Sequence, residues 1–302
     1  MRKSHGITPA FYACYDSKGD INPSAVKEFT RYLIKKGVQG LYVGGSSGEC
    51  IYQSVEERKI VLEEVVKEAK GEIFIIAHVA CNNTKDSQEL AKHAESLGVD
   101  AIAAIPPIYF KLPEHAIARY WNDISSAAPN TPFIIYNIPQ LAGVSLTMSL
   151  LREMRKNPMV CGVKNSSMPV QDIQMFKMEG GKDFTVFNGP DEQFVSGRII
   201  GADGGIGGTY AVMPELFLKA DEYIKSGQNS LAPEIQTDID RIIYKMCEAK
   251  GNLYAVMKEI IKRRTGIDLG SVRLPLAPLF PEDEPIVEEA RKLIEDAIRK
   301  YA

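Results

Sequence analysis

The run Met159-Val-Cys-Gly-Val-Lys164 ends an apolar stretch with a lysine, inside the segment GVKNSS. A short continuous apolar run predicts a β-strand that is buried on both faces. A second apolar run, residues 132–136, lies about one strand-plus-helix upstream and ends at Tyr136. The two runs therefore predict parallel strands, with a lysine and a tyrosine at the points where the strands end.

The chemistry of Lys164 depends on its surroundings. A lysine in apolar surroundings has a lowered pKa, and its neutral amine forms Schiff bases with carbonyl groups, while a tyrosine beside it can move protons. A lone lysine at the end of a strand more often extends its amine into water. The rest of the chain decides between these two interpretations.

The same alternation of strand and helix continues along the chain. Eight short β-rich runs are each followed by a segment with helical periodicity, including a capping box at residues 54–57. A repeat of roughly 20–35 residues predicts an α/β fold of the (β/α)8 TIM-barrel type rather than a doubly wound open sheet. The glycine-rich segment GADGGIGG lacks the spacing of a dinucleotide fingerprint. The predicted strands are residues 6–10, 40–43, 73–79, 101–105, 132–136, 159–163, 184–187 and 203–207.

The β-rich runs stop at Leu231, and three more helices are predicted at residues 235–247, 253–264 and 285–300. We interpret residues 1–228 as the barrel. Residues 229–302 are interpreted as a C-terminal helical extension that packs on the barrel, rather than as an independent domain.

The composition argues against several classes of function. The 302 residues carry a net charge of −3 without a basic run, so no nucleic-acid binding is expected. Five cysteines without CxxC spacing fit a reduced, cytoplasmic protein, and the N-terminus has no signal-peptide pattern. No apolar run approaches the roughly 20 residues that span a bilayer, so no membrane association is expected. The four histidines are scattered, and no metal site is expected.

Polar or glycine-rich segments follow six of the predicted strands. Because catalytic groups of a parallel barrel come from the carboxyl ends of its strands, these segments are expected at one end of the molecule. Lysine, tyrosine, serine and carboxylate side chains suit the activation of a carbonyl group through an imine. The segments are residues 44–49 (GGSSGE), Tyr109, Tyr136, Lys164, residues 189–192 (GPDE) and residues 204–210.

Four motifs occur in a fixed order: GGSSGE at 44–49, YNIP-x-x-x-G at 136–143, GVK-x-S-S at 162–167 and GADGGIGG at 201–208. With these motifs, the chain resembles the N-acetylneuraminate lyase/dihydrodipicolinate synthase family over residues 6 to about 280. The resemblance implies a TIM barrel with a C-terminal helical part, usually assembled as a homotetramer. It also implies a Schiff-base lysine that acts on pyruvate-type substrates without a metal or organic cofactor.

The resemblance further implies roles for individual residues. Lys164 matches the imine-forming lysine, and Tyr136 matches the tyrosine that shuttles protons. Ser47 belongs to a serine pair that binds the pyruvyl carboxylate, and Tyr109 matches a tyrosine that completes the hydroxyl network near a subunit contact. The implied substrate-binding set, which includes carboxylates for the polyol part of a sugar acid, is Ser46, Ser47, Ser166, Gly189, Asp191, Glu192, Gly207 and Gly208.

The charged residues expected near the site indicate which branch of this family, lyase or synthase, the chain resembles. A synthase-like site binds a second carboxylate with an arginine shortly after its Tyr-Asn-Val-Pro segment, whereas this chain has Leu141 there and no arginine nearby. Asp191 and Glu192 would repel a second carboxylate but accept hydrogen bonds from hydroxyl groups. We therefore predict a class I aldol lyase that cleaves N-acetylneuraminate to pyruvate and N-acetylmannosamine.

Two departures from the lyase pattern leave alternatives open. Ser166 replaces a common threonine and keeps the hydroxyl, whereas Gly208 stands where lyases commonly have serine. The missing hydroxyl leaves open a related pyruvate-dependent aldolase for another sugar acid, and dihydrodipicolinate synthase is a further alternative. A non-catalytic sensor of sugar acids is also considered, but it would not need the set Lys164, Tyr136 and Ser47.

Overall fold

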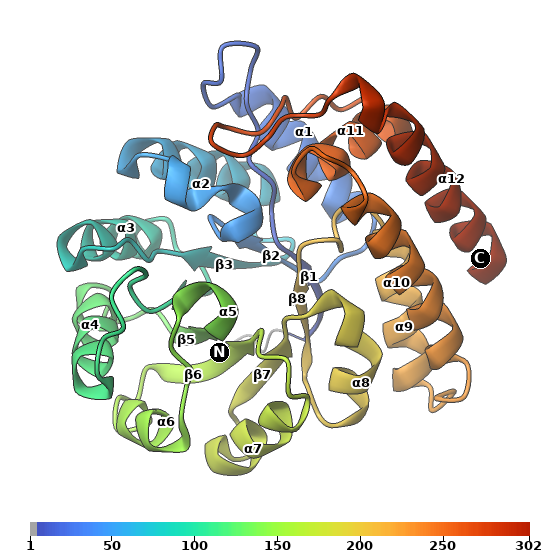
Figure 1. Cartoon of the computed structure of the whole chain (residues 1–302). Coiled ribbons are helices and arrows are strands. Elements are labelled where there is room, and N and C mark those ends of the chain that lie inside the picture. The colour runs from blue at the N-terminus through green and yellow to red at the C-terminus, as the bar shows by residue number, and fades with distance from the viewer. Residues whose placement is uncertain (1–4) are drawn as a thin grey trace.

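The structure is a computed structural model that describes residues 5–302, in which helices surround a ring of strands (Figure 1). All neighbouring strands pair in parallel, in the order β1-β8-β7-β6-β5-β4-β3-β2. The predicted (β/α)8 barrel is confirmed. The strands are β1 (Gly6–Pro9), β2 (Gly40–Val43), β3 (Phe74–His78), β4 (Ala101–Ala104), β5 (Phe133–Asn137), β6 (Val160–Asn165), β7 (Thr185–Asn188) and β8 (Gly204–Gly207).

Contacts between β1 and β2 close the ring. The backbone N–H of Phe11 donates to the carbonyl of Tyr42 at 2.9 Å, and the N–H of Gln39 donates to the carbonyl of Ile7 at 2.9 Å. An isolated parallel bridge also pairs Ala10 with Tyr42. Because the ring is closed and all strands run in parallel, their carboxyl ends surround one opening.

Apolar side chains form two layers. A small cluster that includes Tyr42, Ile76 and Phe187 fills the interior of the barrel. A much larger cluster, which includes Trp121 and Phe217, packs the strands against the helices. The strands are therefore buried on both faces, which explains their continuous apolar runs in the sequence.

The helices form the outer layer (Figure 1). The predicted capping box is present, because Ser54 Oγ accepts from the Glu57 N–H at 3.2 Å and Glu57 Oε2 accepts from the Ser54 N–H at 2.8 Å. The α-helices are α1 (Pro23–Lys35), α2 (Val55–Ala69), α3 (Thr84–Ser96), α4 (Glu114–Ala127), α5 (Pro139–Ala142), α6 (Met148–Met154), α7 (Gln171–Gly180), α8 (Phe194–Ile199), α9 (Pro214–Lys225), α10 (Ala232–Cys247), α11 (Leu253–Thr265) and α12 (Glu284–Tyr301). Short 3-10 helices are η1 (Ser46–Gly48), η2 (Cys50–Tyr52), η3 (Asp191–Gln193) and η4 (Pro281–Asp283).

A buried ion pair fastens the C-terminal extension to the loop after β2. Lys258 Nζ on α11 lies 2.6 Å from Glu49 Oε1, and the two side chains are 1% and 0% exposed. The other oxygen of Glu49 accepts from the backbone N–H of Arg273 at 2.8 Å. Both carboxylate oxygens of Glu49 are thus bound to the extension, which ties it to the loop after β2.

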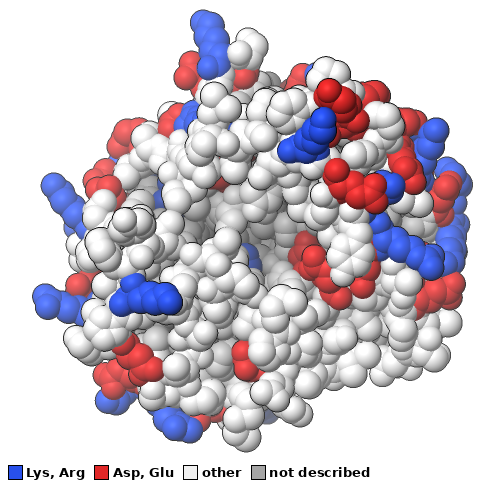
Figure 2. Space-filling view, viewed as in Figure 1, with Lys and Arg blue, Asp and Glu red and all other residues white. Residues whose placement is uncertain are grey.

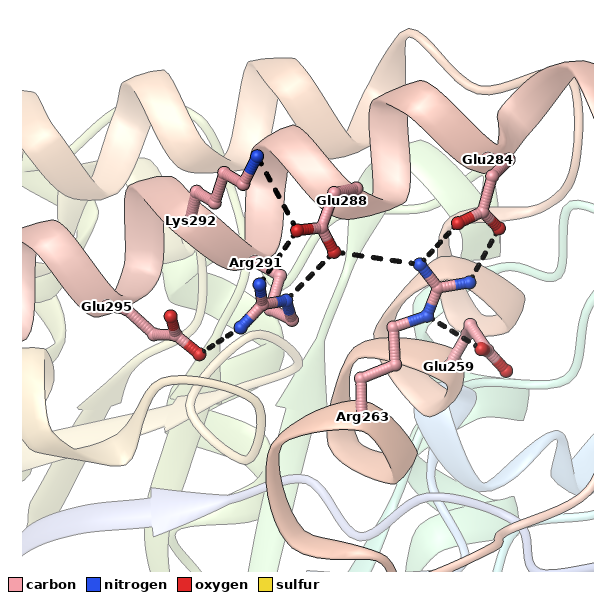
Figure 3. Close-up of polar contacts among 7 residues, drawn as sticks. All are labelled: Glu259, Arg263, Glu284, Glu288, Arg291, Lys292 and Glu295. Atoms are coloured by element: carbon pink, nitrogen blue, oxygen red, sulfur yellow. Dashed lines mark hydrogen bonds and ion pairs between the residues drawn. The ribbon is translucent and has the colours of Figure 1, made fainter.

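A second set of ion pairs joins α11 to α12 at the surface (Figure 3). The guanidinium group of Arg263 lies between Glu259, at 2.8 Å on its own helix, and Glu284, at 2.6 Å on α12. Arg291 extends the set along α12 through its bond to Glu288. Solvent-exposed pairs contribute little to stability individually, so we regard the buried pair as the stronger anchor.

The longest helix, α12, has 18 residues and buries Val287, Ala290, Ile294 and Ala297 along one face. Its other positions are largely charged, as expected of a surface helix. Across residues 5–302, no helix is both long enough and apolar enough to cross a membrane.

The buried pair predicts a large stability effect at Lys258. Replacing Lys258 by Met should lower the free energy of unfolding by about 3–5 kcal/mol, because it leaves the buried Glu49 carboxylate without its cation. Lys262→Met is the matched control on the same helix, since Lys262 is 49% exposed and pairs with an exposed aspartate. Urea unfolding of both variants measures the difference. Equal unfolding midpoints would show that the buried pair does not anchor the extension.

Candidate active site

Most residues predicted to carry the chemistry line one cavity of about 370 Å³ at the carboxyl end of the strands. Seen from the side of Figure 1, the molecular surface is hollowed over the ring of strands, and acidic side chains lie on one wall of the hollow (Figure 2). The predicted residues that line the cavity are Ser46, Ser47, Tyr136, Lys164, Ser166, Gly189, Asp191, Glu192 and Gly208.

Lys164 lies inside β6 rather than just after it, and it pairs in register with Tyr136 of β5. Its side chain is almost fully buried, with Nζ 3.9 Å from the ring centre of Tyr136 and 4.2 Å from that of Tyr42. Burial lowers the pKa of Lys164 to about 7, and attraction to Asp191 opposes this shift. A large fraction of the amine is therefore neutral and nucleophilic near neutral pH.

Tyr136 is also buried, and its ring meets the rings of Tyr42 and His78 edge-on. Burial raises the pKa of Tyr136 to about 12, and hydrogen bonds from Ser166 and Ser46 oppose that shift. The phenol is therefore protonated at neutral pH and directly adjacent to the lysine amine. A protonated phenol beside a reacting centre can act as a general acid.

The loop after β2 presents the two serines. Gly44 adopts a left-handed conformation with φ of 76°, and a Cβ on Gly45 would lie 2.7 Å from the ring of Tyr42, so the turn depends on both glycines. Nδ1 of His78 lies 2.8 Å from the Gly44 carbonyl, to which it must donate. Ser47 follows within η1 and is almost fully buried. The loop is therefore held in a fixed shape around the serine hydroxyls.

Asp191 is buried at the cavity wall. It is 8% exposed, and its Oδ2 accepts from the N–H and the hydroxyl of Thr209 at 2.6 and 2.7 Å. Burial raises its pKa to about 7, which the Thr209 bonds oppose. A Cβ on Gly207 would lie 2.0 Å from Asp191 Oδ1, so Gly207 lies behind Asp191 and does not line the cavity. Glu192 is exposed on the cavity wall.

Glycine at position 189 permits close packing of β7 against β6. A Cβ there would lie 1.9 Å from Ser166 Oγ and 2.7 Å from the carbonyl of Asn165. The N–H of Gly189 also donates to the Asn165 carbonyl at 2.7 Å. Gly189 therefore keeps the Ser166 hydroxyl free to approach Tyr136.

Tyr109 is not brought into this cavity. Its side chain is 89% exposed, its φ is 85°, and it lies beside Phe110 in a separate surface groove. Within one chain, the structure therefore separates Tyr109 from the other predicted residues. Leu141 lies on the cavity wall and is 62% exposed, as expected of a residue near the entrance.

The C-terminal extension supplies part of the cavity wall, which was not predicted. The contributing residues come from α10 and α11, and the side chain of Tyr254 hydrogen-bonds Ser47. The sequence periodicity of α10 and α11 does not mark these positions, because a helix face that lines a cavity has the same apolar pattern as a face that packs on a core. The wall residues from the extension are Ile243, Cys247, Leu253, Tyr254 and Met257. Among residues 5–302, no group of three or more His, Cys, Asp or Glu side chains is arranged to hold a metal ion.

Known proteins resemble this chain over nearly its whole length. The model of the dihydrodipicolinate synthetase family matches residues 3–295. An N-acetylneuraminate lyase of Mediterraneibacter gnavus is 66% identical over 301 residues, which cover 100% of this chain and 96% of that protein. The structure of wild-type Ruminococcus gnavus sialic acid aldolase has a TM-score of 0.98 and 66% identity, and 99% of each chain is covered. A dihydrodipicolinate synthase of Bacillus anthracis, 24% identical with a TM-score of 0.90, shares the fold and covers 97% of this chain and 99% of its own.

Fold and cavity together define a (β/α)8-barrel enzyme with a buried lysine beside a buried tyrosine. The chain belongs to the dihydrodipicolinate synthetase family. The resemblance stated from its sequence motifs is thereby confirmed.

The position of Tyr136 predicts that its replacement lowers turnover but leaves imine formation intact. Tyr136→Phe should lower kcat by about 10²- to 10⁴-fold, because we expect the phenol to act as the general acid at the reacting centre. Reductive trapping of pyruvate on Lys164 should persist in this variant, since the amine keeps its apolar surroundings. Steady-state kinetics and mass spectrometry of the trapped adduct measure the two effects. Near-normal turnover would remove Tyr136 from the mechanism.

Proposed function

We propose that the chain is a class I aldol lyase that cleaves N-acetylneuraminate to pyruvate and N-acetylmannosamine. The observation that carries this proposal is the buried amine of Lys164 against the ring of Tyr136, at 3.9 Å from its centre. The lyase and the aldolase that are 66% identical to this chain support the choice of substrate. A catalytic lysine mutant of the Ruminococcus gnavus aldolase, with a TM-score of 0.98 to this chain, supports a lysine mechanism.

The reaction begins at the neutral amine of Lys164. The amine adds to the C2 ketone of the open-chain sugar acid, and loss of one water gives an imine that withdraws electrons when protonated. Ser46 and Ser47 hold the neighbouring C1 carboxylate through their hydroxyl groups. The imine itself is the electron sink of the reaction, so the proposal needs neither a metal nor an organic cofactor.

Cleavage follows from the imine. The C3–C4 bond breaks, its electron pair moves toward the iminium carbon to give an enamine, and the C4 hydroxyl loses its proton as it becomes an aldehyde. The substrate carboxylate accepts this proton. Tyr136, whose phenol is protonated at neutral pH, then donates its own proton to C3 of the enamine and regains one from the carboxylic acid. Protonation of the enamine at C3 and addition of one water then release pyruvate and restore the amine of Lys164.

The cavity wall favours a neutral, hydroxyl-rich second half of the substrate. Among the described residues that line the cavity, Lys164 alone has a cationic side chain. A distal carboxylate would meet Leu141 and the negative charge of Glu192 instead of an arginine. Carboxylate oxygens accept several hydrogen bonds from hydroxyl groups, so the same wall suits a polyol. These features disfavour dihydrodipicolinate synthase chemistry, in which an aldehyde acid is the second substrate.

One observation supports a second candidate within the same class of reaction. Gly208 lines the cavity without a side-chain hydroxyl. A related sugar acid with a different arrangement of hydroxyl groups is therefore the alternative substrate. A sensor without activity is disfavoured, because binding alone does not require a buried lysine of lowered pKa.

We propose a homotetramer from the family resemblance, and the exposed pair Tyr109 and Phe110 supports a subunit contact. Their rings lie 4.9 Å apart, and the side chains are 89% and 71% exposed. Large exposed aromatic patches mark protein contacts, and covering this patch would bring Tyr109 into a subunit interface. Light scattering should give the mass of four chains, and a stable active monomer would refute this assembly.

The location of the protein is proposed from its cysteines. All five are unpaired in the structure. Unpaired cysteines fit a reducing compartment, so we assign the enzyme to the cytoplasm.

The function is tested by pyruvate release from a panel of sugar acids. The wild-type enzyme should release pyruvate from N-acetylneuraminate, and Lys164→Ala should lose both this activity and borohydride trapping of pyruvate, because the nucleophile is gone. Lys182→Ala serves as the control, since Lys182 is exposed. Faster condensation of pyruvate with aspartate semialdehyde than cleavage of any sugar acid would refute the lyase proposal.

A further inference from the structure

Tyr254 brings a hydroxyl group into the cavity from outside the barrel. It is the second residue of α11, in the C-terminal extension, and it lines the cavity opposite the strands. Its side chain hydrogen-bonds the side chain of Ser47. The hydroxyl is thus fixed against one of the two serines assigned to the substrate carboxylate.

Gly208 lies beside the same serine. A Cβ built on Gly208 would lie 3.1 Å from Ser47 Oγ. The hydroxyl of Tyr12 donates to the Gly208 carbonyl at 2.7 Å, which fixes the direction of that Cβ. A side chain at position 208 would therefore enter the space beside Ser47, where Tyr254 already supplies a hydroxyl group. The glycine leaves that space open for Tyr254 and for a ligand.

The helix that carries Tyr254 is capped at its start and joined to the serine loop. Asn252 caps its first turn by accepting from the Tyr254 N–H at 2.9 Å. Lys258 lies four residues further along, on the same face of α11, and forms the buried pair with Glu49. Glu49 follows Ser47 by only two residues. The buried ion pair therefore joins α11 to the serine loop one helical turn from Tyr254.

We propose that Tyr254 determines specificity for the sugar part of the substrate, replacing the hydroxyl that is missing at Gly208. Its phenol hydrogen-bonds a hydroxyl group of the polyol while it remains bound to Ser47. Burial raises the pKa of Tyr254 above its ordinary value of 10.0, so the phenol keeps its proton. A phenol can donate one hydrogen bond and accept others, which allows both contacts at once. This inference rests on the proposed lyase function.

The test compares Tyr254→Phe, Gly208→Ser and the double variant. Tyr254→Phe should raise the KM for N-acetylneuraminate about threefold to tenfold, the size expected for one neutral hydrogen bond, and change kcat little. Pyruvate trapping should be unchanged. Gly208→Ser in the Tyr254→Phe background should restore most of the lost kcat/KM, because it returns a hydroxyl to the same space. Tyr244→Phe is the matched control, since Tyr244 is 63% exposed on α10.

A short 4-hydroxy-2-oxo acid without a polyol tail separates a sugar contact from an effect on Ser47. Its kcat/KM should be the same in wild type and Tyr254→Phe. An equal loss for the short and the full-length substrate, or an unchanged KM for N-acetylneuraminate, would overturn the proposal. If the wild type cleaves a different sugar acid, the function proposed above fails. The kcat/KM of Tyr254→Phe relative to wild type, measured with that acid and with the short acid, still tests the role of Tyr254.

Discussion

Exclusion of water from Lys164 is the constraint on which the site depends. The amine lies over the faces of two tyrosine rings inside a closed barrel, and burial favours its neutral form. Burial acts on Asp191 in the opposite direction and raises its pKa to about 7 as well. Each group opposes the shift of the other through its charge. The cavity thereby holds a nucleophile and a carboxyl group that both change protonation near neutral pH.

The barrel alone does not complete this environment. Strands β5, β6 and β8, together with the segments that follow the strands, supply most of the cavity lining, while α10 and α11 supply the rest. The pair Glu49–Lys258 joins the two parts directly below the serine loop. The loop that we propose to hold the substrate carboxylate is thus tied to the extension by a buried carboxylate of its own, Glu49. Stability and substrate positioning depend on the same few contacts.

Much of the architecture could be predicted from periodicity. Continuous apolar runs marked all eight strands to within two residues at each end, because strands buried on both faces tolerate little else. The four-residue helix α5 was missed, since a single turn has no periodicity to detect. The segment after β7 begins with the 3-10 turn η3, and α8 starts only at Phe194. Short turns depend on tertiary contacts that local patterns do not report.

The candidate site was predicted less completely than the fold. Lys164, Tyr136 and Ser47 were placed together because each follows or ends a strand of one parallel sheet. Tyr109 follows a strand by the same rule, yet its loop turns outward and the side chain is exposed. Tyr254 escaped prediction because its contact with Ser47 spans more than two hundred residues of chain. Contacts of that kind follow from helix packing and have no local signature.

Titration of the Lys164 amine tests the central claim most directly. Competitive labelling with a small acylating reagent, read at Lys164 by mass spectrometry from pH 5 to 11, gives the pH at which half of this amine is neutral. We predict a midpoint near 7, because burial lowers the pKa from its ordinary value of 10.5 to about 7. Exposed lysines in the same sample provide the internal reference. Reactivity at Lys164 that rises only above pH 9, together with that of the exposed lysines, would contradict the account.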